Sequence, residues 1–309
     1  MTQPKLAVAG SGYGGRGYRQ IFGDGSVVMS ITTSLGAVGD PKGLIHWNVE
    51  QTALYAVTHI DDLLSRTEEA GVRYLQYVTK AQKADVLDDD ELDVFSASRV
   101  VLDDLSNTGT YIHQYIDDDL NGRFTMEPYR EDHVEMVEAW HDWKDAHDIE
   151  VLATEATVFG DGYAGTGDIW AAVDGVPMCI DTKSSRKIGL SHLGQLAALG
   201  AADTMAVEVP KGTPGAVYHK LTPAVAKQHG GQVDSYWVPK AVPAFNTYGV
   251  LQIRPGDFHR STGEYLDPFC ELHVIPQEQI DAAWNYFQAG VMARKAEREL
   301  KALMKEDDE

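Results

Sequence analysis

The dipeptide Asp174-Gly175 lies between two short apolar runs, and it constrains the fold more than any other feature of this sequence. The first run, GTGDIWAAVD, covers residues 165–174, and the second, VPMCIDTK, covers 176–183. Aspartate followed by glycine between two such runs is a strong signal for a tight β-hairpin. The preceding segment EVLATEATVF (150–159) is rich in β-branched residues and alternates in polarity. Together the three segments predict a three-stranded meander.

Helical periodicity dominates the chain before this meander and at its end. Helices are predicted at 44–75, 106–120, 131–147, 190–203 and 276–304, with further strands at 204–210 and in a hairpin over 246–269. This order indicates an α+β fold: a central mixed β-sheet flanked by helices, with a helical N-terminal part and a long C-terminal helix. We expect a single domain over 41–309, divided into a helical part (41–148), a sheet core (149–275) and a C-terminal helix (276–309).

The first forty residues are rich in glycine. The stretch KLAVAGSGYGGRGY looks like a strand that enters a dinucleotide-binding glycine turn. However, its apolar run covers only Leu6 to Ala9, and no second strand ending in an acid follows about 20 residues later. We therefore interpret residues 1–40 as a flexible Gly-rich segment. A dinucleotide-binding enzyme stays open as an alternative, and it predicts nicotinamide or flavin binding.

The net charge of −21 argues against a nucleic-acid partner when it is taken alone, because phosphate contacts require Lys and Arg. The charge is uneven, however. Residues 85–150 hold 20 Asp and Glu but only 4 Lys and Arg, and they include an expected exposed loop at Asp88-Asp89-Asp90-Glu91. We interpret this stretch as a solvated, self-repelling surface, with a DNA-mimicking or partner-binding surface as the alternative. A local basic groove elsewhere in the chain is compatible with this distribution.

Cysteine content and hydropathy limit the other classes of protein. Cys179 and Cys270 are too few and too far apart for a disulfide framework, so a reducing cytosol is expected. They also exclude a four-thiolate iron–sulfur cluster within the chain. The sequence contains no run of about 18 apolar residues, so no membrane span is predicted, and the N-terminus lacks a signal-peptide pattern. We expect a cytoplasmic protein with no membrane partner.

Two carboxylates and a lysine flank the predicted hairpin. The Asp174-Gly175 turn would bring Asp168 and Asp181 together near one end of the strand pair. Converging carboxylates suit Mg²⁺ or Mn²⁺, which prefer oxygen ligands. Lys183 lies two residues after Asp181, so its ammonium would lie on the same face of the strand. There it could orient a water molecule or stabilise charge on a phosphoryl group.

These residues form part of an ordered set of motifs. Gly165-Thr166-Gly167-Asp168 is followed by IDTKSS around Asp181 and Lys183, and then by Gln195 in GQLAALG. Upstream, Gly109-Thr110-Tyr111-Ile112-His113 lies on a predicted helix, and PKGLIHWNVEQTA covers 41–53. Over roughly residues 41–270 the chain resembles the PD-(D/E)XK nuclease superfamily, and in particular its RecB-like branch, which includes many phage recombination exonucleases. No proline precedes Asp168 here, and Leu199 stands where relatives often have an aromatic residue.

The resemblance implies a restriction-endonuclease-like core and a role for each matching residue. Asp168, Asp181 and the backbone carbonyl of Thr182 would bind one or two Mg²⁺ or Mn²⁺ ions, and His113 would add a ligand. Lys183 would position or activate the water, and Gln195 would steady the lysine or contact DNA. Some relatives have an acid near the metals at the position of Glu155.

Each of these residues also has a purely structural interpretation. Lys183 could simply pair with Asp181, and His113 could bond to Asp117 one helical turn later. Glu155 could be a structural acid, and Gln195 could be an ordinary helix residue. For Arg186 and Lys187, contacts to DNA phosphates and a solvated turn both stay open.

The leading hypothesis is a metal-dependent deoxyribonuclease, most specifically an exonuclease that serves recombination or DNA-end processing in a bacterial or phage-infected cytosol. No G-x-x-x-x-G-K-[ST] motif occurs, so no nucleotide cofactor is expected. The partners would be linear DNA ends and a helicase, annealing or single-strand-binding protein, and ring-forming relatives make a homo-oligomer an open alternative. A nuclease fold without activity, used to bind DNA ends or a protein, is the competing hypothesis.

Overall fold

The computed structural model describes residues 3–8, 15–39, 41–65, 68, 94, 97–259 and 262–306. The chain divides into two compact units. The larger unit combines Met1–Gly39 with Gly109–Glu309, and the smaller unit covers Asp40–Thr108. The sequence predicted a single domain over 41–309, whereas residues 1–39 group with the larger unit and 40–108 form a separate one.

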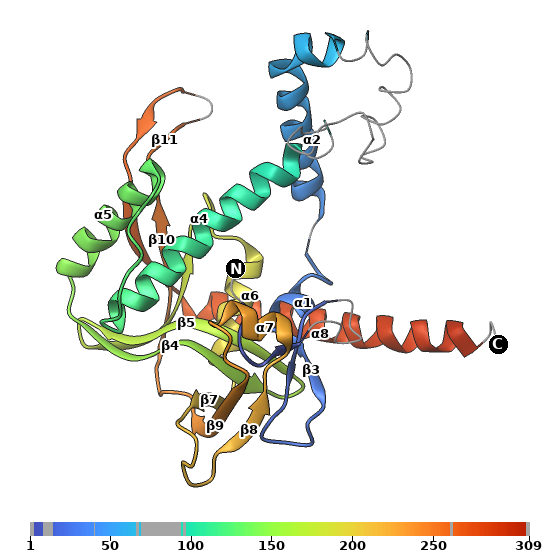
Figure 1. Ribbon diagram of the computed structural model, residues 1–309, viewed down its shortest axis with the longest axis vertical. Helices are drawn as coiled ribbons and strands as arrows, with labels where there is room; N and C mark the ends of the chain where they lie inside the picture. The colour runs from blue at the N-terminus through green and yellow to red at the C-terminus, as the bar shows by residue number, and fades with distance from the viewer. Residues whose placement is uncertain are drawn as a thin grey trace. The chain divides into compact units, whose positions relative to one another are not determined.

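A large mixed sheet with flanking helices forms the larger unit and confirms the predicted α+β class (Figure 1). Its strands are β1 (Ala7–Val8), β2 (Gly17–Arg19), β3 (Val27–Ser30), β4 (Ile149–Gly160), β5 (Tyr163–Val173), β6 (Val176–Lys183), β7 (Thr204–Glu208), β8 (Val217–Lys220), β9 (Asp234–Ala241), β10 (Thr247–Arg254) and β13 (Phe269–Ile275). A separate two-stranded sheet pairs β11 (Asp257–Phe258) with β12 (Tyr265–Leu266).

Helices belong to both units. Those within the larger unit are α1 (Ile31–Leu35), α5 (Glu131–Asp145), α6 (Leu190–Gly200), α7 (Pro223–Gln228) and α8 (Gln277–Glu306). The smaller unit contains α2 (Pro41–Thr58), and α4 (Ala97–Leu120) crosses the boundary between the units at Gly109. The helix predicted over 44–75 corresponds to α2, and the loop predicted at Asp88–Glu91 lies outside the described residues.

The predicted meander is confirmed, with β4 antiparallel to β5 and β5 antiparallel to β6. Asp174 and Gly175 have φ values of 50° and 77°, so both turn residues are left-handed, as a type I′ turn requires. The pairing of β5 with β6 runs from the turn to Ile169 opposite Ile180. Asp168 and Asp181 are the next residues on each strand, at the open end of the hairpin.

Side chains alternate between two apolar layers on the faces of this sheet. Ile169 and Ile180 pack in one buried cluster with residues of α4 and α5. Trp170 and Cys179, their immediate neighbours, pack in another with residues of α1, α6 and α8. Both faces of the β5–β6 hairpin are therefore covered, which explains why these two strands are buried over most of their length.

Two different strands, β3 and β6, pair with β5 along the same edge. β3 pairs with its beginning, at Tyr163 and Ala164, and β6 pairs with its end, from Ile169 to Val173. Between them, residues 165–168 have no strand partner on that edge within the described part of the chain. The sheet therefore forks at Asp168, and a fork leaves room for a functional side chain.

The N-terminal segment was predicted to be flexible, and for residues 15–39 this is wrong. They form β2, β3 and α1, and Tyr18, Met29 and Ile31 are buried in the larger unit. β1 pairs antiparallel with β2, whereas a dinucleotide-binding turn leads from a strand into a helix of a parallel unit. Residues 9–14 of the glycine stretch lie outside the described residues.

The C-terminal half differs from the prediction in its pairing. β10 lies parallel to β6 and antiparallel to β13, so the hairpin predicted over 246–269 extends to Ile275, with β11 and β12 between its strands. β8, β9 and α7 were not predicted; on β9, burial alternates at its start, with Ser235 and Trp237 buried. Among the described residues, no helix combines the length and the apolar character needed to span a membrane.

Candidate functional site

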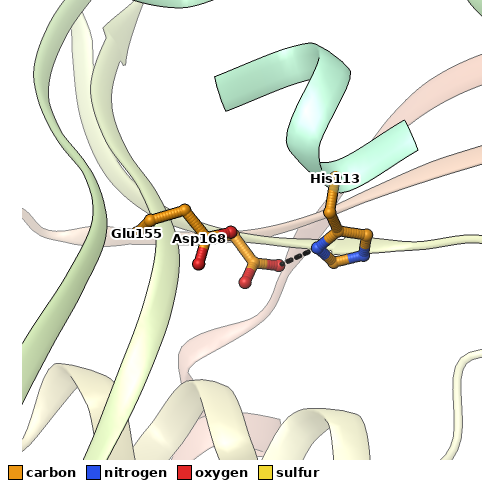
Figure 2. Close-up of side chains that lie close together, drawn as sticks. All are labelled: His113, Glu155 and Asp168. Atoms are coloured by element: carbon orange, nitrogen blue, oxygen red, sulfur yellow. Dashed lines mark ion pairs between the residues drawn. The ribbon is translucent and has the colours of Figure 1, made fainter. Parts of the chain in front are cut away.

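Three potential ligand side chains converge at the fork in the sheet. His113 comes from α4, Glu155 from β4 and Asp168 from β5, and one ligand atom of each lies within 4.8 Å of the others. His113 Nδ1 and Asp168 Oδ2 lie 3.5 Å apart. Figure 2 shows the imidazole and the two carboxylates directed toward one another. The residues are separated by up to 55 positions in sequence, so only the tertiary fold brings them together.

The position of Glu155 follows from the register of β4 and β5. Thr154 pairs with Ile169 and Ala156 with Gly167, so Glu155 lies opposite Asp168. Glu155 itself has a φ of 44°, which is left-handed and uncommon for a residue with a side chain. Such a conformation costs on the order of 1–3 kcal/mol and is typical of functional positions. The backbone of β4 is thus irregular opposite Asp168.

The second carboxylate, Asp181, is paired with the lysine that follows it. Lys183 Nζ lies 2.5 Å from Asp181 Oδ2 and donates a hydrogen bond to the Thr182 carbonyl at 3.1 Å. The Thr182 amide donates to Asp168 Oδ2 at 2.7 Å, which links the two carboxylates across the open end of the hairpin. Asp181 is fully buried, and apart from the ion pair its oxygens have no hydrogen-bond partner among the described residues.

Burial sets the electrostatics of this pair. Desolvation raises the pKa of Asp181 and that of Asp168, although the Lys183 ammonium opposes the rise in both. Desolvation also acts to lower the pKa of Lys183, but the charges of Asp181 and Asp168 outweigh it, so the lysine pKa is raised. The ammonium is therefore held in its charged form by the two carboxylates.

The pKa values of His113 and Glu155, the other two residues of the cluster, are shifted in opposite directions. Desolvation, followed by repulsion from Lys183, lowers the pKa of His113 to about 4, so the imidazole is neutral near pH 7 and has a lone pair to donate. The pKa of Glu155 is raised well above its usual value by desolvation and by the charges of Asp168 and Asp117. Its side chain nevertheless keeps access to solvent.

This donor set fits a divalent cation. Carboxylate oxygens and a neutral imidazole suit Mg²⁺ and Mn²⁺ in combination, with oxygen ligands in the majority. The charge of Asp168 raises the pKa of Asp181 and that of Glu155. A cation would relieve this repulsion and satisfy the oxygens of Asp181. Asp168, Asp181, Glu155 and His113 would hold the ion. The Thr182 carbonyl, the other predicted ligand, accepts the Lys183 hydrogen bond instead.

The remaining predicted residues are not part of this cluster. Gln195 is half-buried on α6 and makes no hydrogen bond within the described residues. Arg186 is exposed and forms an ion pair with Asp257. Lys187 is exposed, and its backbone carbonyl accepts a hydrogen bond from the Ser185 hydroxyl.

Of two further residues near the site, His192 was not singled out from the sequence, and Asp117 was considered only as a partner of His113. His192 on α6 has a pKa lowered by desolvation and then by Lys183, so it lies within electrostatic reach of the lysine. Asp117 accepts a 2.5 Å hydrogen bond from the Thr154 hydroxyl and pairs with Arg123, so it does not serve as the partner of His113. Helical spacing was the available signal, because Asp117 follows His113 by four residues and His192 precedes Gln195 by three.

No protein-family model matches this chain, and a search of curated proteins finds no match.

Proposed function

We propose that this protein is a metal-dependent deoxyribonuclease that hydrolyses phosphodiester bonds. The observation that carries the proposal is the convergence of His113, Glu155 and Asp168 beside the buried Asp181–Lys183 pair, at the fork of a mixed sheet. The motif order that resembles the RecB-like branch of the PD-(D/E)XK superfamily supports the same conclusion. That branch favours an exonuclease that acts on DNA ends in recombination.

The chain's own residues have separable roles in this proposal. When bound, Mg²⁺ or Mn²⁺ would supply Lewis acidity toward the phosphoryl oxygens and lower the pKa of water. Asp181 keeps the Lys183 ammonium charged and in place, so the lysine can orient the attacking water and stabilise negative charge on the phosphate. The Thr182 amide fixes the Asp168 carboxylate through their hydrogen bond.

The test is cleavage of an end-labelled linear duplex and of a covalently closed circle, each with Mg²⁺, with Mn²⁺ and with a chelator. We expect metal-dependent loss of the linear DNA only. Lys183→Ala should reduce the rate at least 100-fold, because charge stabilisation of this kind typically contributes that much. Lys220→Ala, which removes an exposed lysine from β8, is the matched control and should cleave like the wild type.

Lys183→Ala leaves the buried Asp181 charge without its partner, which typically costs about 3–5 kcal/mol. The double variant Asp181→Asn/Lys183→Met removes both charges and keeps the volume, so it separates lost chemistry from lost folding. Thermal unfolding should show this double variant to be folded and the cleavage assay should show it to be inactive. If the wild type cleaves neither DNA with either metal, the nuclease proposal is wrong. The fold would then serve binding alone.

A further inference from the structure

A small hairpin beyond the catalytic strands presents aromatic side chains to solvent. Phe258 on β11 is 62% exposed, and Tyr265 and Leu266 on β12 are 47% and 45% exposed. The rings of Phe258 and Tyr265 pack edge to face, with centroids 5.3 Å apart. Neighbouring exposed apolar side chains of this size are unfavourable in water, and such patches mark interaction sites.

The hairpin is held firmly at its base by α5. Glu135 accepts hydrogen bonds from the Gly256 amide at 2.9 Å and from the Tyr265 hydroxyl at 3.3 Å. The phenol lies directly against Gly256, where a Cβ would come within 1.9 Å of the hydroxyl oxygen. One carboxylate therefore fixes both the strand and the ring, and the aromatic pair is an ordered surface.

The same hairpin is tied to the loop that follows the catalytic lysine. Asp257 forms ion pairs with Arg186, three residues after Lys183, and with Arg254 at 3.1 Å. Gln252 is aligned with Lys183 in the β10–β6 pairing and donates a 2.6 Å hydrogen bond to the Ser185 carbonyl. Phe258 follows Gln252 by six residues, at most about 20 Å of extended chain.

We propose that Phe258, supported by Tyr265, is a stacking platform for a nucleobase of a DNA strand whose backbone leads to the Lys183 site. This inference rests on the proposed nuclease function and adds the contact that holds the strand. Stacking is the interaction suited to this chain: its net charge of −21 limits affinity from phosphate contacts, whereas a base stacks on an aromatic ring without any charge requirement. The exposed Lys187 follows Arg186, which pairs with Asp257 at the base of the hairpin, and it offers a cation for the strand's backbone.

The experiment measures binding of single-stranded oligonucleotides by fluorescence anisotropy, with Mg²⁺ present. All proteins carry Asp181→Asn/Lys183→Met, the folded and inactive double variant, so that the strand is not degraded. A set of oligonucleotides with one abasic site each is scanned along the strand. The protein with the native Phe258 should bind an oligonucleotide roughly tenfold more weakly than the intact strand when the abasic site occupies one or two adjacent positions. This loss lies within the range of base–aromatic stacking. Phe258→Ala should bind the intact strand roughly tenfold more weakly and lose the abasic penalty there, and Phe258→Trp should restore both.

Tyr218→Ala is the matched control, because Tyr218 is 51% exposed and its hydroxyl also donates to a carboxylate, that of Asp234. It lies on β8, at the other end of the sheet, and should keep the abasic penalty unchanged. If Phe258→Ala retains the same penalty at the same positions, the platform is wrong while the nuclease proposal stands. If the parent protein binds no oligonucleotide and the wild type cleaves no DNA, both proposals are wrong together.

Discussion

Asp181 shows most clearly what a single residue contributes here. Its carboxylate is fully buried, its pKa is raised by desolvation, and one ion pair with Lys183 is its only polar interaction among the described residues. A buried ion pair of this kind is weak evidence for a stabilising role, because desolvation offsets much of the Coulomb attraction. A requirement for function explains its presence better, and the neutral His113 near it fits the same requirement.

At this scale we predict that the His113 imidazole stays neutral well below pH 6.5. Its pKa of about 4 results first from desolvation and then from Lys183. Because the folded-state pKa lies below the unfolded value of about 6.5, its contribution to stability is complete above pH 6.5 and is lost as the pH falls toward 4. NMR titration of histidine ring signals measures this, with His113→Gln to assign the signal. A midpoint at or above 6.5 would contradict the buried position of the ring.

At the scale of elements, the β5–β6 hairpin determines where the carboxylates lie. Its type I′ turn fixes the register, and the register places Asp168 and Asp181 together at the open end. The fork formed by β3 and β6 on one edge of β5 then opens the sheet at Asp168. The site is therefore a consequence of strand pairing as much as of residue chemistry.

The turn itself can be tested through Gly175. Its φ of 77° is left-handed, and nothing lies within 4 Å of a Cβ added there, so any cost of substitution is conformational. Gly175→Ala should destabilise the protein by roughly 1–2 kcal/mol, which lowers the melting temperature by a few degrees in a unit of this size. Gly175→Asn should lose less, since asparagine tolerates this conformation. Equal melting temperatures for the alanine variant and the wild type would show that the turn is not left-handed in solution.

At the scale of the whole molecule, the dominant property is the net charge of −21. Self-repulsion at this charge opposes the compact state, and it also repels DNA phosphates. Both effects act through solvent, so both depend on ionic strength. A protein that binds DNA despite this charge must rely on a few local cations and on uncharged contacts.

Salt should therefore move stability and DNA affinity in opposite directions. Between about 20 and 300 mM KCl, screening should raise the thermal midpoint, because the repulsion between carboxylates weakens as the Debye length shortens. Over the same range, affinity for a single-stranded oligonucleotide should fall, because the release of counterions by cation–phosphate contacts is less favourable at higher salt. Thermal scans and anisotropy titrations at matched salt concentrations measure both. A thermal midpoint that falls as KCl is added would contradict the role given to self-repulsion.

By itself, the sequence determined the local features of this protein. The Asp174-Gly175 turn, the meander around it and the α+β class follow from backbone preferences and periodicity, which act over a few residues. The spacing of Asp168, Asp181 and Lys183 around that turn was also enough to predict that the two carboxylates converge. Their order with the upstream His113 motif suggested the chemistry.

Only the tertiary structure decided which distant segments meet. It placed Glu155 opposite Asp168 and brought His113 to them from α4. It also added strands from residues 15–39 to a sheet that was expected to begin much later in the chain. It also paired Arg186 with Asp257, 71 positions later in the sequence. The physical reason is that strand and helix partners are selected by burial and pairing across the whole chain. No short stretch of sequence contains that information.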